Sequence, residues 1–264
     1  MIAVSVVIIT KNKADIIPAC IEKAKLITDD IIIIDNNMGA EQSITSINGC
    51  RIYKKNWDGY GANKNKGIDE AKYNWILSID ADEMPDDDLI KSLHELDYSD
   101  AATVYDIKFR SYFGKKMIKY GSWGRDHHIR LFNRSLVRWL ETMVHETLVL
   151  PQNVQVKKVD GYVHHYSVKD ADEYESKSSY YAKLSAKKYF STGKKANTIK
   201  LYISPVFGFL RNYIFYLGFL DGREGWQIAK ITIRNTQRKY RFLKQMESIQ
   251  QKKQIYNDNL VVEY

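Results

Sequence analysis

The sequence predicts an α/β protein in which a mixed, mostly parallel sheet is flanked by helices and followed by a C-terminal helical extension. Three features indicate this class. Continuous β-branched runs alternate with helical periodicity up to about residue 100, as in βαβ units. Residues 101–166 then carry irregular β-like runs, and the pattern beyond residue 169 is helical. We therefore divide the chain into a domain of residues 1–168 and a basic, aromatic-rich extension of residues 169–264.

The elements of the first half follow from local periodicity. Residues 3–10, "AVSVVIIT", form an unbroken apolar run, which is typical of a strand buried on both faces. A helix is predicted within residues 11–27, where Ile17, Cys20, Ile21 and Ala24 recur at helical spacing. Next come, in order, a strand at 30–37, a short strand at 50–55, a glycine-bearing loop and helix over 56–73, and a strand at 74–82.

The second half changes in character. The runs "AATVYDIKFRSYF", "HIRLFNR" and "DGYVHHYS" are candidate strands of an antiparallel extension of the sheet. Residues 170–192 and 206–250 are predicted to be helical, and strand-like alternation returns only in the final "LVVEY".

Composition and charge limit the classes of function. Of 264 residues, 44% are hydrophobic and 27% charged, which excludes wholesale disorder. Residues 1–168 hold 22 Lys and Arg against 23 Asp and Glu (net −1), whereas residues 169–264 hold 18 against 9 (net +9). Nucleic acid and an anionic membrane are the partners that such a basic extension suits.

The compartment is predicted from the cysteines and the N-terminus. Cys20 and Cys50 lack metal-ligand spacing and resemble the thiols of a reducing compartment. The N-terminal "MIAVSVVIITKNK" lacks the charged region and cleavage site of a signal peptide. We expect a cytoplasmic protein.

Polar side chains end three predicted strands, at Thr10, at Asp35 and at Asp80 and Asp82. Ligands of doubly wound sheets bind at the carboxyl ends of the strands, so these groups are expected to share one crevice. Two carboxylates that face a common point require a cation between them, and oxygen ligands select Mg²⁺ or Mn²⁺.

An alternative role for acids in this stretch is to cap the helix that begins near Pro85. We assign that role to Asp86, Asp87 and Asp88. Asp80 and Asp82 precede the proline and end the strand, and we assign them to the metal.

Five segments together carry a family resemblance. They are "SVVIITKNKADII", "IIIIDNN", "GYGANKNKGIDEAKYNWILSIDADE", "RLFNRSLVRWLETMVHE" and "HHYSVKDADEYESK". The pattern resembles family 2 glycosyltransferases of the GT-A, Rossmann-like fold, and is most similar to the bacterial lipopolysaccharide-core glucosyltransferase-like subgroup. The resemblance covers nearly the whole chain. The glutamine of the processive Gln-x-x-Arg-Trp motif is absent from "LVRW" at 136–139, which favours transfer of a single sugar.

The resemblance implies a metal-dependent transferase with a sugar-nucleotide donor, a UDP-sugar by expectation, and a glycan or glycolipid acceptor of cell-envelope polysaccharide synthesis. It implies no nucleic-acid partner and leaves a homo-oligomer open. The donor-side residues that it implies are Thr10, Asn12, Asp35, Asn36, Lys64 and Asp80. We add Tyr60, because it and Trp57 flank the glycine-bearing loop. The metal ligands that it implies are Asp80, Asp82 and His165. Asn36 and Asn37 stand where many relatives carry an acidic, glycine- and hydroxyl-rich turn, so their ribose contacts stay open.

Glu146, in "TMVHETL", matches the position of the catalytic base in similar enzymes. A base must deprotonate the acceptor hydroxyl, and with one base and no second nucleophile the expected outcome is inversion at the anomeric carbon. The alternative is that Glu146 forms a structural ion pair with Arg130, Arg134 or Arg138. Most of the remaining histidines are expected to be hydrogen-bonded strand residues, because no pair has the i, i+4 spacing of zinc ligands and no cysteine joins them.

Residues 201–220, "LYISPVFGFLRNYIFYLGFL", carry one formal charge, Arg211. They reach the length of a membrane span, but a central arginine is costly in hydrocarbon. We expect an interfacial helix pair at the inner face of the cell membrane, with a dimer interface or ordinary helix packing as alternatives. A competing function is a non-catalytic nucleic-acid or lipid binding protein that uses the basic helices. A nucleotidyltransferase is less favoured, because "TKNKADII" has no glycine after the first strand.

Overall fold

The structure is a computed structural model that describes residues 1–11, 16–37, 44, 46–141, 147–197 and 199–260, with side chains up to residue 253. Its contacts divide the chain into two compact units. The first unit is Met1–Tyr112 with Gly124–Ser167, and the second is Phe113–Trp123 with Val168–Tyr264. The sequence did not indicate that residues 113–123 belong with the C-terminal helices. The functional roles assigned to residues 1–168 and 169–264 stay predictions.

The first unit is built on four parallel strands. They lie in the order β3-β2-β1-β4 and are β1 (Val4–Thr10), β2 (Asp30–Asp35), β3 (Cys50–Lys54) and β4 (Trp75–Asp80). Thr10 pairs with Asp35, and Ile9 pairs with Asp80. The register therefore brings the carboxyl ends of β1, β2 and β4 to one edge, as the sequence predicted.

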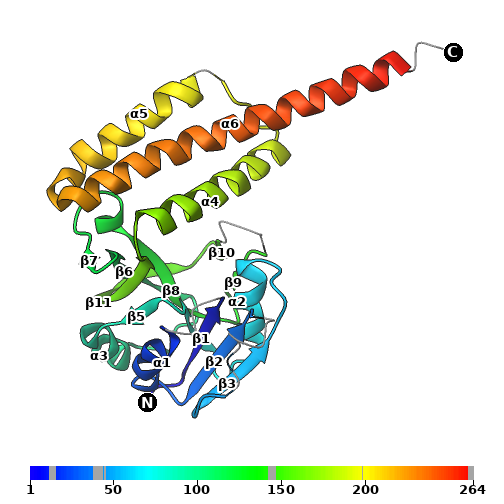
Figure 1. Cartoon of the computed structure of the whole chain (residues 1–264). Coiled ribbons are helices and arrows are strands. Elements are labelled where there is room, and N and C mark those ends of the chain that lie inside the picture. Colours follow the sequence, from blue (N-terminus) through cyan, green and yellow to red (C-terminus); the bar gives the residue numbers. More distant parts are fainter. Residues whose placement is uncertain (12–15, 38–43, 45, 142–146, 198, 261–264) are drawn as a thin grey trace. The chain divides into compact units, whose positions relative to one another are not determined.

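Helices cover both faces of these strands (Figure 1). Alternate residues of a strand point to opposite faces, so Val4, Val6 and Ile8 pack in one apolar cluster while Val7 and Ile9 pack in another. The first cluster includes α1 (Ile17–Lys25) and α3 (Asp87–Glu95), and the second includes Ile68 of α2 (Tyr60–Asp69). Burial on both sides explains why β1 and β2 are apolar at nearly every position.

An antiparallel half continues the sheet in the order β4-β8-β6-β11-β5. Its strands are β5 (Glu83–Pro85), β6 (Thr103–Phe113), β8 (His127–Asn133) and β11 (Gln155–Val168). β8 runs antiparallel to both β4 and β6, and β5 runs antiparallel to β11. A separate hairpin joins β9 (Arg138–Trp139) and β10 (Leu148–Val149). The predicted mixed sheet with an antiparallel extension is confirmed.

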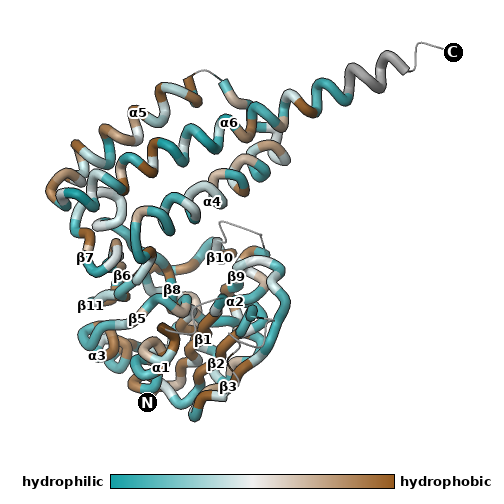
Figure 2. The backbone as a smooth tube through the Cα atoms, viewed as in Figure 1, coloured by the Kyte–Doolittle hydropathy of each residue, from teal (hydrophilic) through white to brown (hydrophobic). Residues whose placement is uncertain are grey.

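The second unit is helical. Both α4 (Ala171–Ser191) and α5 (Ser204–Phe209) pack against α6 (Gly222–Leu260), and Figure 2 shows apolar residues along α5. Short π-helical segments, Ile199–Ile203 and Leu210–Phe215, extend α5 at both ends. The unit also contains β7 (Lys116–Met117), and the 3-10 turn Trp123–Arg125 spans the boundary of the two units along the chain.

Residues 206–250 are mostly helical, as predicted, but the helical segment starts earlier and is broken in the middle. The helical segment begins at Ile199, and the chain bends before Gly218–Asp221, a 3-10 turn. Leu217 takes a left-handed φ of 59° there. A Cβ at Gly225 would lie 2.0 Å from the Gly218 carbonyl oxygen, so this close approach requires glycine. α6 runs through Leu260, and the rest of the predicted "LVVEY" strand lies outside the described residues.

No single helix in the described part of the chain is both long and apolar enough to cross a membrane. Ile199–Phe215 and Gly218–Lys253 satisfy the criterion only as a pair, and they meet at a bend of 71°.

Candidate active site

Thr10, Asp35 and Asn36 lie together at the ends of β1 and β2, and all three are buried. The Asp35 carboxylate accepts the backbone N–H groups of Asn37 and Ile44, each at 3.0 Å. In this structure Asp35 therefore holds the chain that follows β2. Thr10 Oγ1 and Asn36 Oδ1 have no hydrogen-bond partner among the described residues.

An amide network joins this edge to the start of α2. Asn36 Nδ2 donates to the Lys55 carbonyl at 2.9 Å and to Asn63 Oδ1 at 2.6 Å. Asn63 is fully buried and donates in turn to Asp58 Oδ1 at 3.0 Å. Asn36 therefore has a structural role that its position in the sequence did not reveal.

Tyr60 is the first residue of α2. Its ring packs edge-on against Trp57, with centroids 4.6 Å apart. The ammonium of Lys11, the residue after β1, lies 5.0 Å from the centre of the Trp57 ring. The glycine-bearing loop and the end of β1 are therefore neighbours, as expected.

The acid turn, Asp80–Glu83, connects β4 to β5. Because β5 pairs with β11, Glu83 lies opposite His165, and Tyr166 N donates to the Asp82 carbonyl at 2.9 Å. The pairing brings His165 Nε2 to 3.9 Å from Asp82 Oδ1. Two of the predicted metal ligands, 83 positions apart (165 − 82), are thus adjacent in space.

Two cations are buried against the acid turn. Lys64 is fully buried and its Nζ lies 3.2 Å from Asp80 Oδ1. Arg130, on β8, forms an ion pair with buried Glu83 and lies 3.8 Å from Asp80 Oδ2. The Lys64 ammonium therefore forms an ion pair with Asp80 in this structure. Its contact with a donor phosphate stays a prediction.

Burial and these cations act oppositely on the two acids. Burial disfavours the charged form of Asp80, but Lys64 and Arg130 together outweigh it and hold the pKa of Asp80 below its ordinary value. Burial raises the pKa of Glu83 although Arg130 acts against it. Asp80 is thus held as a carboxylate.

The acids after Pro85 cap α3, as predicted. Asp86 is the N-cap, and its carboxylate accepts the Leu89 backbone N–H at 2.8 Å. Asp87 and Asp88 follow in the first helical turn, where negative charge favours the helix dipole.

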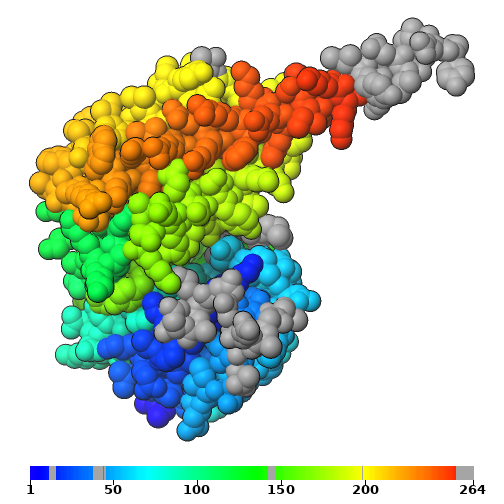
Figure 3. All heavy atoms as spheres, viewed as in Figure 1, coloured from blue at the N-terminus to red at the C-terminus, as the bar shows by residue number. Residues whose placement is uncertain are grey.

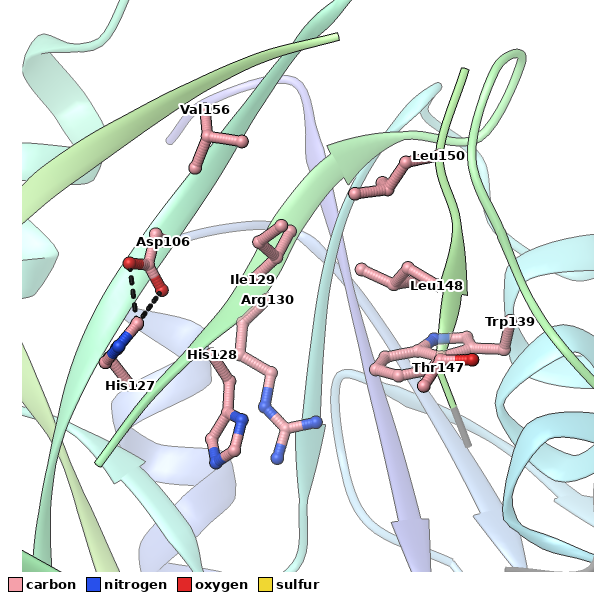
Figure 4. Close-up of a pocket in the computed structure, with 10 residues that line it drawn as sticks. All are labelled: Asp106, His127, His128, Ile129, Arg130, Trp139, Thr147, Leu148, Leu150 and Val156. Atoms are coloured by element: carbon pink, nitrogen blue, oxygen red, sulfur yellow. Dashed lines mark hydrogen bonds and ion pairs between the residues drawn. The ribbon is translucent and has the colours of Figure 1, made fainter. Parts of the chain in front are cut away.

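A cavity of about 590 Å³ is lined in part by Arg130, the arginine that pairs with Glu83 of the acid turn (Figure 4). One side presents polar groups, including His127, whose Nδ1 lies 2.8 Å from an Asp106 carboxylate oxygen. The other side is apolar, with Leu148, Leu150 and the Trp139 ring. Arg130 lines the cavity and also contacts Glu83, so one guanidinium joins the cavity to the acid turn. The cavity is lined by Asp106, His127, His128, Ile129, Arg130, Trp139, Thr147, Leu148, Leu150 and Val156.

A comparison with protein families finds that residues 5–148 match the model of "Glycosyl transferase family 2". This chain belongs to that family. The match spans the parallel strands, the acid turn and most of the cavity lining. The glycosyltransferase predicted from the sequence is thereby confirmed as an enzyme class, and the competing class of a non-catalytic binding protein is wrong.

Curated relatives of this glycosyltransferase carry the same class of name. An uncharacterized glycosyltransferase of Rickettsia typhi is 27% identical over 239 residues, which cover 84% of this chain and 80% of the relative. The lipopolysaccharide core biosynthesis glycosyltransferase LpsC of Rhizobium meliloti is 28% identical over 220 residues, covering 79% and 80%.

Among solved structures, S. aureus TarS 1-349 in complex with UDP-GlcNAc is 12% identical, with a TM-score of 0.47, and the match covers 92% of this chain and 91% of that one. In a match to a longer TarS chain, only 39% of that chain is covered. These similarities are weak and assign no ligand to this glycosyltransferase.

The glycosyltransferase has the right ligand types for a divalent cation near Asp82. The carboxylates of Asp80 and Asp82 and the imidazole of His165 suit Mg²⁺ or Mn²⁺. Among the residues with a described position, no preassembled group of three or more ligating side chains occurs. Mg²⁺ is commonly held by one or two carboxylates together with substrate phosphates, so the residues fit such an ion.

Two predicted site residues, Asn12 and Glu146, lie outside the described residues. The arginines proposed as ion-pair partners of Glu146 have other partners. Arg130 binds Glu83, Arg138 binds Asp69 at 2.6 Å, and Arg134 donates to the carbonyls of Ile68 and Ala71. Thr147, the residue after Glu146, lines the cavity.

Sequence reasoning missed Glu83 and the true role of Arg130. The available signal was an arginine within "HIRLF", a strand whose next residues are apolar, because a charge at such a position must find a buried partner. Trp139 both packs in the second cluster and lines the cavity.

Of the histidines other than His165, His164 lies 3.0 Å from the Tyr112 hydroxyl, and His127 and His128 each contact an aspartate, as predicted for strand residues. His94 lies on α3 instead and contacts the Leu26 carbonyl, and His145 lies outside the described residues.

Proposed function

We propose that this glycosyltransferase moves one hexosyl group from a UDP-sugar to a hydroxyl of a cell-envelope glycan or glycolipid, with inversion and with Mg²⁺ or Mn²⁺. The main support for this proposal is that Arg130 both pairs with Glu83 of the acid turn and lines the cavity. The acids that would bind the metal are therefore close to a space for the acceptor. The similarity to LpsC supports an envelope acceptor, which the enzyme would meet at the cytoplasmic face of the membrane.

The donor would bind at the ends of β1 and β2. Buried Thr10 Oγ1 and Asn36 Oδ1 have no partner in the described part of the chain. Buried polar atoms are normally hydrogen-bonded, and the N–H and O–H groups of a base and ribose would complete them. In this proposal Asp35, through the chain that it holds, together with Asn12, Tyr60 and Lys64, completes the donor side.

Asp80, Asp82 and His165 would hold the metal. When bound, the metal would stabilise negative charge on the departing diphosphate. The chain's own contribution is positional, because Lys64 and Arg130 keep Asp80 ionised and the β5–β11 pairing keeps His165 beside Asp82.

The acceptor would occupy the cavity. Its apolar side suits the face of a pyranose ring and its polar side suits hydroxyl groups. In the reaction the Glu146 carboxylate takes the proton of the acceptor hydroxyl and the oxygen attacks the anomeric carbon. The bond from that carbon to the phosphate oxygen breaks, and UDP leaves with the electron pair. One displacement inverts the anomeric centre.

Glu146→Gln is expected to lower kcat by at least about 100-fold, because the amide cannot accept the hydroxyl proton and general-base catalysis contributes on the order of 10²–10⁴. Donor affinity should change little. Initial rates and donor binding by calorimetry check both points. Glu141→Gln, a change of the same charge on an exposed residue nearby, is the control, and near-normal turnover of Glu146→Gln would remove the assignment.

Thermal stabilisation by a panel of nucleotides and sugar nucleotides, each with and without Mn²⁺, tests the donor and the metal together. A ligand that binds only the native state raises Tm. We expect UDP or a UDP-sugar to raise Tm only with the metal. A rise in Tm with another nucleotide would show that the donor is not a UDP-sugar. A rise that does not need the metal would contradict the proposed cofactor, and no rise with any nucleotide would contradict the proposed donor binding.

A further inference from the structure

The second unit exposes large apolar side chains over one short stretch of sequence, residues 199–226, which Figure 3 shows in yellow to orange at the surface. Phe215 is 69% exposed and Phe207 60%. We name this set the apolar face; it comprises Ile199, Tyr202, Ile203, Val206, Phe207, Leu210, Ile214, Phe215, Leu217, Phe219, Leu220 and Trp226. Monomeric soluble proteins rarely expose so many large apolar groups together.

We propose that the apolar face binds an anionic lipid surface and holds the protein on the membrane without crossing it. The proposed function brings the enzyme to a membrane, and this inference adds which residues make the contact and with which lipid class. The contact itself does not depend on catalysis.

The exposed side of this helical segment is apolar. Ile199, Ile203, Phe207, Leu210 and Ile214 recur at steps of three or four residues and all are exposed, so they share one outward stripe. In a water-facing helix that stripe would be polar.

Two buried positions in and just after this segment are polar. Buried Asn212 accepts the Ser122 backbone N–H at 2.5 Å. Buried Asp221 accepts the backbone N–H groups of Lys119 and Tyr120 at 3.1 and 2.9 Å. Polar groups inside and apolar groups outside suit a segment whose outer surroundings are hydrocarbon.

Charge favours anionic lipid over a second copy of the chain. Exposed cations border the apolar face, namely Lys194, Lys195, Arg211, Arg223 and Lys230. Residues 169–264 hold 18 Lys and Arg against 9 Asp and Glu. Two such faces would oppose like charges, whereas anionic headgroups pair with them while the apolar side chains enter the acyl boundary.

The geometry favours lying in the interface. The segments on either side of the bend meet at 71°, and exposed Arg211 lies near the middle of the apolar stretch. An arginine in the hydrocarbon centre is costly, but at the headgroup level its side chain reaches phosphate.

Co-sedimentation of the full chain with vesicles tests this surface. One set of vesicles is phosphatidylcholine alone, and the other also contains about 30% phosphatidylglycerol as the anionic lipid. We expect binding to the anionic vesicles that weakens as salt rises. The variant Phe207→Glu with Phe215→Glu is expected to lower the partition coefficient at least about tenfold, because two charges would have to enter the acyl boundary.

The matched control is Tyr180→Glu with Ile249→Glu. These residues are 55% and 57% exposed, belong to the same unit and lie outside the apolar face, and the variant adds the same charge. Its partition coefficient should stay within about twofold of the parent, and Tm confirms that each variant is folded. Equal losses in both variants, or no binding to anionic vesicles by the parent chain, would overturn the inference.

Light scattering supplies the remaining distinction. An oligomer that the Phe207→Glu, Phe215→Glu variant dissociates, with no vesicle binding by the parent, would assign the face to a second copy and overturn the lipid contact. Because binding is measured without donor or acceptor, either negative result leaves the proposed sugar transfer untouched. Loss of transfer with vesicle binding intact would have the opposite meaning.

Discussion

Asp82→Asn is expected to lower kcat/KM by about 10³-fold and to abolish the metal-dependent rise in Tm with UDP or a UDP-sugar. A metal that would stabilise the charge of the departing diphosphate contributes several kcal/mol to the transition state, and 1.36 kcal/mol is tenfold in rate. Asparagine retains the shape of Asp82 and the backbone bond from Tyr166 to its carbonyl, so the fold should persist.

The control for this variant is Asp88→Asn, the same substitution at an exposed position in the first turn of α3. Metal titrations followed by Tm, together with initial rates over a range of Mn²⁺ concentrations, separate loss of metal affinity from loss of fold. A variant that keeps the parent's Mn²⁺ dependence and rate would show that Asp82 holds no metal.

Arg130→Met is expected to lower the free energy of unfolding by about 3–5 kcal/mol. The substitution leaves the Glu83 side chain, which is 2% exposed, without its guanidinium partner, and removal of one member of a buried ion pair typically costs this much. Methionine keeps the apolar contact area, so the loss would report the charge. Urea denaturation at neutral pH gives the measurement.

The double variant Arg130→Met with Glu83→Gln makes the reason testable. Removal of both charges should recover at least half of the lost stability, because no buried charge then lacks a partner. An Arg130→Met variant within about 1 kcal/mol of the parent would instead mean that Glu83, whose pKa burial raises, takes up a proton, or that water reaches the site. A double variant less stable than either single variant would mean that the two residues act independently.

These two variants examine different parts of one arrangement. Lys64 and Arg130 come from α2 and β8 and hold the acid turn from two sides. The turn is thereby held by the same guanidinium that lines the cavity. A transferase needs such fixed groups, because a catalytic arrangement works only when its own supports are rigid.

The parallel strands and the acids at their ends could be predicted from the sequence. Both rest on local patterns, since β1, β2 and β4 are buried on two faces and therefore carry near-continuous apolar runs. Asp86 as a helix cap was equally local, because the cap bonds a backbone group three residues away. The family followed from the same motifs, and the match over residues 5–148 agrees with it.

The partners of the charged groups could not be predicted. Arg130 and Glu83 are 47 positions apart, and His165 is 83 positions from Asp82. The sequence did not show which arginine pairs with Glu83 or which histidine lies beside Asp82. The register of the antiparallel strands decides both contacts. The break in the helical extension could not be predicted for a related reason. It accompanies the close approach of Gly218 to Gly225, which lies in the next helix.

The sequence alone therefore determined which segments form the sheet, which acids end its strands and which enzyme family the chain resembles. Only the tertiary structure decided that Arg130 links Glu83 to the cavity, that His165 lies beside Asp82 and that residues 199–226 turn their apolar side chains outward. The physical reason is that periodicity and capping act over a few neighbouring residues. The pairing of buried charges and the exposure of a helix face depend on which distant strands and helices lie against them.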